Sequence, residues 1–455
     1  MYGDPPATVE DHRGAVHRLG AKLGQGAQGA VFATDDPRRV VKLLAEASAP
    51  ARTALAARFA RIRRLDLDEL HLARPLELLA EPHVGYVMEL LDEMQPLTTL
   101  MRPRGALMPW HVETGGLRRR LRLLAHAGEA LTGLHARGLA YVDPSPRNVF
   151  VSTDLDHDEA WLIDTDNISV AGHGEALYTP SYGAPELVAG HGSVSTLSDA
   201  HAFAVIAFEA LALTHPLIGD AIDQGEPELE DEAFEGRWPW IDDPDDDRNR
   251  SSCGIPRAWV LSPLLGKLAH RTFGPGLLDR LARPSVREWV EALHQAADAT
   301  VACKRCGATF YLTSDRCPSP GCGAAAPAVV FGEILNGWIH DDDPDKRRRV
   351  DPPRRGVIAV TDTGFAIQRR HLTGRTEPAA REVICTLRRM PRGLEICADS
   401  DVPVAAINLD GRHVDLGPRP RIIPLDRRDI WRLHLGDRER LHRVIEFADW
   451  PEGQR

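Results

Sequence analysis

A glycine-rich stretch near the start of the chain has the residue types needed for close contact with phosphate. It fits the pattern G-x-G-x-x-G-x-V and comprises Leu23, Gly24, Gln25, Gly26, Ala27, Gln28, Gly29 and, two residues on, Val31. Glycines are needed where backbone approaches a phosphate, because a Cβ would hold the chain away. A dinucleotide-binding unit uses similar glycines to open a helix. Residues 30–32 are instead β-prone, so the sequence favours a strand, a turn and a second strand.

A lysine follows in an apolar run that reads as a buried strand. Lys42 lies within the segment Val-Val-Lys-Leu-Leu at 40–44, where a cation costs several kcal/mol, roughly, unless it meets a negative partner. Phosphate oxygens would supply that partner. The alternative is a lysine on an edge strand with its ammonium group in solvent.

Two acids and an amide come later, each at the end of a predicted element. Asp143 and Asn148 form a D-x-x-x-x-N pattern in a polar loop with two prolines, and Asp164 follows the apolar strand at 161–163. Carboxylate and amide oxygens are hard ligands that suit Mg²⁺. The loop comes directly after leucines and alanines at helical spacing over 117–134, and Gly138 marks the end of that predicted helix.

Taken together and in this order, these motifs resemble eukaryotic-type protein kinases, in a divergent form typical of bacterial serine/threonine kinases. The resemblance covers residues 18–296, with a small lobe at 18–90 and a large lobe at 91–296, after a leader at 1–17. It implies that the glycine-rich backbone covers the phosphates of ATP and that Lys42 pairs with the α- and β-phosphates. It also places Met88, Glu89 and Leu90, in a strand at 86–91, against the adenine.

The same resemblance assigns the reaction to the later motifs. Asp143 would accept the proton of a substrate hydroxyl, while Asn148 and Asp164 would hold Mg²⁺. Thr179 and the Ala-Pro-Glu sequence at 184–186 resemble the end of an activation segment. The expected function is transfer of the γ-phosphate of Mg-ATP to a serine or threonine of a protein substrate.

Three departures from the kinase pattern bear on activity. Residues 47–65 form a predicted helix without any acid, although the family places there a glutamate that pairs with the lysine; Glu46, Asp66, Asp68 and Glu69 are candidate substitutes. Asp-Thr-Asp at 164–166 replaces Asp-Phe-Gly, and Val142 and Ser145 replace the usual arginine and lysine. These differences leave open a pseudokinase that acts as a nucleotide-binding scaffold, and also a kinase for small molecules.

Four cysteines have the spacing of a zinc site. Cys303, Cys306, Cys317 and Cys322 form C-x2-C-x10-C-x4-C, with a β-prone stretch at 309–312 between the pairs. Four thiolates close a tetrahedral shell and leave no position for water, so a structural zinc ribbon at 300–326 is favoured over a catalytic metal. Reduced thiols without metal are the alternative. The remaining three cysteines stand alone, which does not indicate a disulfide framework.

Beyond the cysteines, short alternating runs separated by Gly, Pro and Asp predict a small β-sandwich at 327–455. Residues 406–412 and 429–433 resemble the last strands of forkhead-associated domains, although the phosphothreonine-binding arginine and serine of that family are not identified. The expected fold class is therefore α+β: a two-lobed kinase fold, a zinc ribbon and an all-β interaction domain. Two charged runs, an acidic one at 226–247 and a basic one at 346–355, read as solvated loops.

The chain as a whole fits an intracellular protein. It lacks an apolar run long enough to cross a bilayer and an N-terminal signal core, which predicts a cytoplasmic protein without a membrane partner. Its net charge of −11 argues against a dedicated nucleic-acid binder. The divergent catalytic loop and the zinc appendage resemble bacterial kinases that work alongside metal-dependent protein phosphatases and von Willebrand A-type proteins. That resemblance implies such partners.

Overall fold

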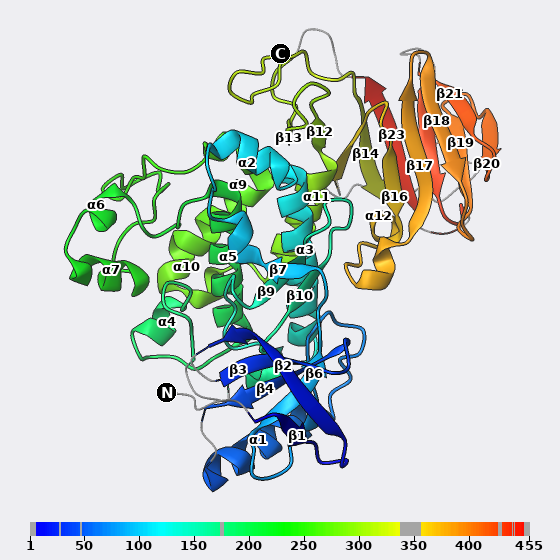
Figure 1. Cartoon of the computed structure of the whole chain (residues 1–455). Coiled ribbons are helices and arrows are strands. Elements are labelled where there is room, and N and C mark those ends of the chain that lie inside the picture. Colours follow the sequence, from blue (N-terminus) through cyan, green and yellow to red (C-terminus); the bar gives the residue numbers. More distant parts are fainter. Residues whose placement is uncertain are drawn as a thin grey trace. The chain divides into compact units, whose positions relative to one another are not determined.

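A computed structural model describes residues 6–26, 29–45, 48–172, 177–336, 356–425, 430–438, 440 and 442–449 of the chain (Figure 1). The chain forms two compact units. The first comprises Met1–Arg102, His126–Cys253 and Leu268–Arg287, and the second comprises Pro103–Ala125, Gly254–Lys267 and Glu288–Arg455. The expected domain boundaries at 17, 90, 296 and 326 stay predictions.

The first unit begins with an antiparallel sheet of order β1-β2-β3-β4-β6-β5. Its elements are β1 (Thr8–Glu10), β2 (Val16–Gln25), β3 (Gly29–Thr34), β4 (Arg39–Leu44), helix α1 (Ala49–Ile62), β5 (Pro75–Leu78) and β6 (Gly85–Glu89). Ser48 caps α1, since its side chain accepts a hydrogen bond from the Ala51 amide. The buried residues Leu55 and Phe59 of α1 pack with Leu78 and Tyr86 of the sheet. This strand–turn–strand and helix arrangement confirms the predicted elements.

The rest of the first unit is mainly helical, with short strands. It contains β7 (Met94–Pro96), η1 (Leu97–Leu100), β8 (Leu139–Ala140), β9 (Val149–Ser152), β10 (Ala160–Leu162), η2 (Thr165–Asn167), β11 (Ser169–Val170), α4 (Pro185–Val188), α5 (Thr196–Ala212), α6 (Asp220–Asp223), α7 (Pro227–Phe234), α10 (Pro275–Leu278) and η3 (Arg280–Ala282). Helix α5 is buried along almost its whole length, so it forms the centre of this region. The strands β10, β9 and β7 form one small sheet, and β11 pairs with β8.

Three helices contribute residues to both units: α3 (Gly116–His135), α9 (Pro263–Phe273) and α11 (Val286–Asp298). Helix α3 is the helix predicted before the polar loop, and Gly138 follows its end in a left-handed conformation with φ +70°. The second unit also contains α2 (Leu107–Glu113) and α8 (Arg257–Val260).

The second unit ends in a small ribbon followed by two β-sheets. Strands β12 (Thr300–Ala302) and β13 (Thr309–Tyr311) pair antiparallel. The six-stranded sheet has the order β15-β14-β23-β22-β19-β20, and the four-stranded sheet has the order β16-β17-β18-β21. Their bounds are β14 (Val330–Asn336), β15 (Gly356–Val360), β16 (Phe365–Gln368), β17 (Val383–Met390), β18 (Gly393–Ala398), β19 (Val404–Asn408), β20 (His413–Leu416), β21 (Arg421–Pro424), β22 (Trp431–Leu435) and β23 (Arg443–Asp449), with α12 (Arg369–Thr373) and η4 (Pro378–Arg381) between β16 and β17.

Buried apolar residues from both sheets share one core. Ile334 and Ile445 of the larger sheet and Ile384 and Ile396 of the smaller one belong to the same cluster. Two sheets that share a core are the arrangement expected of a sandwich. The mixed helix-and-strand class is confirmed for the described residues, and the β-sandwich domain at 327–455 stays a prediction. The basic run at 346–355 lies outside the described residues.

Among the described residues, no helix is both long enough and apolar enough to cross a bilayer.

Candidate functional site

Lys42 lies at the centre of the first sheet, as the buried apolar run predicts. Its strand β4 pairs Lys42 with Val31 of β3 and with Tyr86 of β6, and the residue is 7% exposed. The ammonium group lies 5.5 Å from the centre of the Tyr86 ring and forms an ion pair with the carboxylate of Asp164. A buried cation requires such a partner. Two predicted site residues are thus brought into direct contact.

The glycine-rich turn connects β2 to β3. The amide of Gly26 donates a hydrogen bond to the carbonyl of Gly29 over 2.8 Å, and this bond closes the turn between the two strands. Gly29 is required by its neighbours, because a Cβ there would overlap the carbonyl oxygen of Leu43 on β4. Leu23, Gly24, Gln25 and Gly26 are exposed, whereas Val31 is partly buried. Ala27 and Gln28 lie outside the described residues.

Met88, Glu89 and Leu90 lie at the end of β6, beside the strand that carries Lys42. Met88 pairs with Val40 of β4, and the amide of Leu90 donates to the carbonyl of Arg38 over 2.9 Å. Met88 is partly buried and packs against the cluster that joins α1 to the sheet. Of the three residues predicted to meet adenine, Met88 and Glu89 therefore belong to the same sheet as Lys42, and Leu90 follows directly after it.

Asp199 at the start of α5 holds the loop that carries Asp143. Its two carboxylate oxygens accept hydrogen bonds from the amides of Tyr141 over 2.6 Å and Val142 over 3.1 Å, and His135 contacts it at 3.0 Å. Val142 has a φ of +88°, which a β-branched residue adopts only when its surroundings enforce it. Asp199 is fully buried, so it fixes the backbone immediately before Asp143.

Asp143 is half-buried, and the negative charges of other acids act on it. Its Oδ1 accepts hydrogen bonds from the amide of Thr179 over 2.7 Å and from the Thr179 hydroxyl over 2.8 Å. Burial raises the pKa of Asp143; the Thr179 hydrogen bonds oppose that rise, and the negative charges of Asp164 and Asp199 add to it. A carboxylate with a raised pKa accepts a proton more readily than an ordinary aspartate, which suits a general base.

Asn148 precedes β9 and Asp164 follows β10, so both lie at the same end of this antiparallel strand pair, where Val149 pairs with Leu162. The side-chain nitrogen of Asn148 donates to the carbonyl of Asp143 over 3.1 Å, which leaves its side-chain oxygen as the atom that can ligate a cation. The carbonyl of Asn148 accepts from the amide of Ile163 over 3.0 Å, next to Asp164. Asp164 itself is left-handed, with φ 59° and ψ 43°. A backbone hydrogen bond between Ile163 and Asn148 therefore holds the two predicted Mg²⁺ ligands, Asn148 and Asp164, close together.

The segment with the Ala-Pro-Glu sequence is anchored to the helical region. Glu186 forms a two-pronged ion pair with Arg283, at 2.8 and 2.7 Å. The Tyr182 hydroxyl donates to Glu209 of α5 over 2.6 Å. These contacts hold the chain that carries Thr179 against Asp143. Sequence reasoning named Thr179 only as part of a motif and missed its contact with Asp143.

Helix α1 carries no acid, as the sequence indicates, and its arginines point to another arrangement. Arg58 donates to the side-chain oxygen of Asn167 over 3.0 Å, and Arg61 donates to the carbonyl of Ile168 over 2.6 Å. Of the candidate substitutes for the missing glutamate, Asp68 pairs with Arg74 and Glu46 lies outside the described residues. Lys42 instead meets the carboxylate of Asp164.

The four cysteines of the second unit come together as predicted. Their sulfur atoms all lie within 4.8 Å of one another, with Cys303 and Cys322 at 3.7 Å and Cys306 and Cys317 at 3.7 Å. A tetrahedron with Zn–S bonds of about 2.3 Å has edges of about 3.8 Å, whereas a disulfide would need about 2.05 Å. No disulfide joins these four cysteines, and the group can hold a metal ion.

Backbone amides surround the cluster and favour thiolates. Burial opposes ionisation of Cys303, but the amides of Cys306 and Arg305 donate to its sulfur and lower its pKa to about 7. Without a cation the cluster cannot ionise throughout, and burial raises the pKa of Cys317 to about 12. The β-prone stretch predicted between the pairs forms β13, and β13 pairs with β12 on the other side of the first cysteine pair. The turn at 303–308 therefore forms part of that hairpin.

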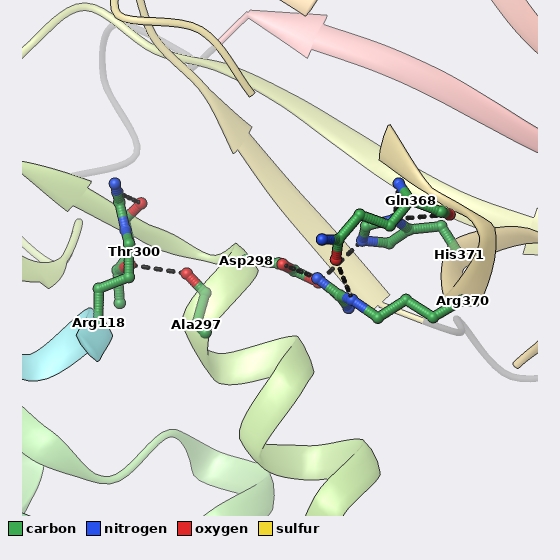
Figure 2. A network of polar contacts seen from close by, with 7 residues as sticks. All are labelled: Arg118, Ala297, Asp298, Thr300, Gln368, Arg370 and His371. Carbon is green, nitrogen blue, oxygen red and sulfur yellow. Dashed lines mark hydrogen bonds and ion pairs between the residues drawn. The ribbon is translucent and has the colours of Figure 1, made fainter. Parts of the chain in front are cut away.

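A second polar network in this unit has no counterpart in the sequence analysis (Figure 2). The carboxylate of Asp298, at the end of α11, accepts two hydrogen bonds from Arg370 at 2.8 and 2.6 Å and contacts His371 at 3.1 Å. Gln368 accepts from the Nε of Arg370 over 2.7 Å. Burial alone would raise the pKa of Asp298, but Arg370 and His371 hold it well below its usual range. A single acid at a helix end gives no sequence signal for such partners.

No protein-family model matches the chain, but individual proteins are similar to it. The chain is 31% identical over 141 residues to the serine/threonine-protein kinase PknA of Mycobacterium tuberculosis, and equally to that of Mycobacterium bovis, with 30% of each chain covered. It is 29% identical over 357 residues to the serine/threonine-protein kinase pkn2 of Myxococcus xanthus, which covers 72% of this chain and 37% of that protein. The chain thus spans only 30% to 37% of the length of these curated relatives. It is related to bacterial serine/threonine-protein kinases.

Proposed function

We propose that the chain is a serine/threonine protein kinase with a two-lobed catalytic domain at residues 18–296. One observation carries this proposal: Lys42, Asp143, Asn148 and Asp164 belong to one unit and are linked by direct contacts, although they come from three separate segments. The relationship to bacterial kinases supports the same reaction. The lysine, the two aspartates and the asparagine also follow one another in the sequence in the same order as in protein kinases, which a chance cluster of such residues would not be expected to do.

In the proposed reaction, the hydroxyl oxygen of a serine or threonine forms a bond to the γ-phosphorus of ATP. The bond between that phosphorus and the β–γ bridging oxygen breaks, and ADP leaves. Asp143 accepts the hydroxyl proton, which its raised pKa favours. Lys42 binds the α- and β-phosphates, and the backbone of residues 24–29 covers them.

Magnesium fits the oxygen donors of this site. Asn148 and Asp164 would hold Mg²⁺, which neutralises charge between the β- and γ-phosphates when bound. Asp164 is already oriented by its ion pair with Lys42 and by the left-handed backbone. Met88, Glu89 and Leu90 would line the adenine end of the site.

The second unit is proposed to add structure and recognition. The four-cysteine ribbon at 300–326 would hold one structural Zn²⁺, because its sulfur separations fit a tetrahedron. The β-sandwich would bind a protein. A metal-dependent protein phosphatase and a von Willebrand A-type protein are the partners that the resemblance implies.

The test of the kinase proposal is phosphate transfer from γ-labelled ATP by the full chain with Mg²⁺, with and without a basic protein substrate. We expect transfer, and we expect the Asp143→Ala variant to lose about 10²-fold to 10⁴-fold, the usual contribution of a general base. Exposed Asp36, which caps a turn far along the chain from Asp143, provides a control: its alanine variant should keep full activity. Transfer that persists in Asp143→Ala would contradict the proposed role.

A nucleotide-binding scaffold is the second candidate, favoured by the absence of an acid from α1. It predicts Mg²⁺-dependent ATP binding, measured by thermal shift, with no transfer to any substrate or to the chain itself.

A further inference from the structure

The missing carboxylate on α1 has a counterpart in two arginines of the same helix. Arg58 and Arg61 are three residues apart and therefore share one side of α1. Both reach the turn that follows Asp164: Arg58 contacts the Asn167 side chain at 3.0 Å, and Arg61 contacts the Ile168 carbonyl at 2.6 Å. The helix is thus joined to the turn by two directed hydrogen bonds from charged donors.

That turn holds Asp164 in an unfavourable backbone conformation. A left-handed conformation is unfavourable for a residue other than glycine and persists only where neighbouring contacts enforce it. On one side the Thr165 hydroxyl donates to the carbonyl of Ala73 over 3.0 Å. On the other side the η2 turn ends at Ile168, which is fully buried and whose carbonyl accepts from Arg61. The arginines therefore complete the restraint on the turn from the α1 side.

Asp164 needs a restraint that does not depend on Lys42. Their ion pair fixes the carboxylate only while the lysine is not engaged elsewhere, and the proposed reaction gives Lys42 to phosphate. A kinase with a glutamate on this helix couples helix and lysine directly. Here the coupling runs from α1 through Asn167 and Ile168 to Asp164.

We propose that Arg58 and Arg61 are positioning residues that keep Asp164 in place for a divalent cation, and so replace the missing helix carboxylate. This inference rests on the proposed function, since it concerns the same Mg-ATP site. It predicts that these arginines tune the Mg²⁺ requirement of the site without touching the nucleotide.

The experiment measures the Mg²⁺ concentration that half-saturates ATP binding, and in parallel phosphate transfer, at fixed ATP. We expect the Arg58→Ala/Arg61→Ala variant to need about tenfold more Mg²⁺, because two charge-assisted hydrogen bonds that orient a ligand are lost. Arg64→Ala removes one positive charge from an exposed position just beyond α1 and should leave the requirement unchanged. A merely structural role would lower the active fraction, measured by thermal melting, without moving the half-saturating concentration.

A pair exchange provides the rescue. Asn167→Asp restores a partner of opposite charge for a lysine, so Arg58→Lys/Asn167→Asp should recover most of the Mg²⁺ affinity that Arg58→Ala loses. An unchanged Mg²⁺ requirement in the double alanine variant would overturn the inference alone. Absence of any Mg²⁺-dependent ATP binding in the unaltered chain would overturn the proposed function and this inference with it. Binding without transfer, combined with the expected Mg²⁺ shift, would keep the inference and favour the scaffold.

Discussion

The four-cysteine cluster and the site around Lys42 and Asp164 are both proposed to hold a cation, but they are built in opposite ways. The cysteines lie within twenty residues of one another on two tight turns, and their sulfur atoms already have tetrahedral spacing. The ion pair of Lys42 and Asp164 instead joins residues 122 positions apart. One site is encoded locally, and the other exists only once the sheet, the polar loop and α5 have assembled.

The two sites also differ in how they affect stability. Thiolates around zinc have no other partner of comparable strength, so the metal stabilises the fold that presents them. The acids of the other site repel one another, and Asp164 and Asp199 both raise the pKa of Asp143. A site prepared to bind charge in this way costs stability until its ligand arrives. We therefore expect zinc binding at the four cysteines to stabilise the fold strongly, and cation binding at the site around Lys42 and Asp164 to stabilise it only weakly.

Removal of zinc should give the largest effect. Structural zinc contributes roughly 10–16 kcal/mol in small zinc-binding peptides, so a chelator or Cys306→Ser should unfold the ribbon. Faster hydrogen exchange over residues 300–326 and loss of bound zinc, determined by metal analysis, would show this. Cys253→Ser, which alters an exposed lone cysteine, should change neither. If hydrogen exchange over residues 300–326 is unchanged in a chain free of zinc, then the ribbon is stable with its cysteines as thiols, and the proposed dependence on zinc is contradicted.

Substitutions in the Asp298 network test whether a buried ionic site without metal stabilises the second unit, as the zinc ribbon is expected to do. Asp298→Ala leaves the guanidinium of Arg370 buried without its carboxylate, which typically costs about 3–5 kcal/mol. The chain offers a matched control, because the adjacent Arg369 pairs with Asp401, whose side chain is 79% exposed. Asp401→Ala should cost less than about 1 kcal/mol. Hydrogen exchange in α12 measures both, and equal effects would contradict the distinction.

The pH dependence of that network follows from the lowered pKa of Asp298. A carboxyl group whose native pKa lies below its unfolded value stabilises the fold above the unfolded pKa, about 3.9, and loses this contribution as pH falls further. The α12 region should therefore keep its protection at neutral pH and lose it in acid. The Asp298→Ala variant should show less of this acid sensitivity.

Features that depend on residues close together in the sequence were predicted well. The glycine-rich turn, the strand with Lys42, the apolar side of α1 and the cysteine spacing are all short-range patterns, and each corresponds to an observed element. The order of the motifs was also sufficient to indicate the relationship to bacterial kinases.

What the sequence could not give are the pairings between distant segments. No pattern indicates that Lys42 meets Asp164, that Thr179 donates twice to Asp143, or that Arg370 reaches Asp298 across 72 residues. Each partner is one of many charged or hydroxyl residues, and only the fold selects among them. The arrangement of the two sheets was likewise beyond reach, because the register depends on packing across the sandwich.

The glycines of the phosphate turn give a smaller effect that separates folding from binding. Gly29→Ala places a Cβ against the Leu43 carbonyl and should destabilise the first sheet by about 1–3 kcal/mol, as overpacking does. A Cβ on Gly26 meets no described atom within 4 Å. Gly26→Ala should therefore melt like the unaltered chain but bind ATP more weakly. Chemical denaturation and nucleotide titration distinguish the two, and equal losses of stability would contradict the assignment.

Asp143→Asn should give the smallest effect on stability, and one of opposite sign. Because the native pKa of Asp143 is raised, the ionised carboxylate is less favourable in the folded chain than in the unfolded one, and stability is lost as pH rises through the native pKa. Asparagine removes the charge yet keeps an Oδ1 that accepts both hydrogen bonds from Thr179. The variant should therefore melt slightly higher than the unaltered chain at about pH 7, and the difference should vanish as the pH falls below the unfolded-state pKa of an aspartate, about 3.9.

Phosphate transfer should be lost in the same variant, so that activity and stability move in opposite directions. Asp143→Ala provides the control, because it also removes the charge but gives up both hydrogen bonds from Thr179 and should not gain stability. Thermal melting of the three proteins across this pH range decides the matter. If Asp143→Asn is less stable than the unaltered chain at neutral pH, then the acids around Asp143 do not strain the fold, and the contrast with the self-sufficient cysteine cluster disappears.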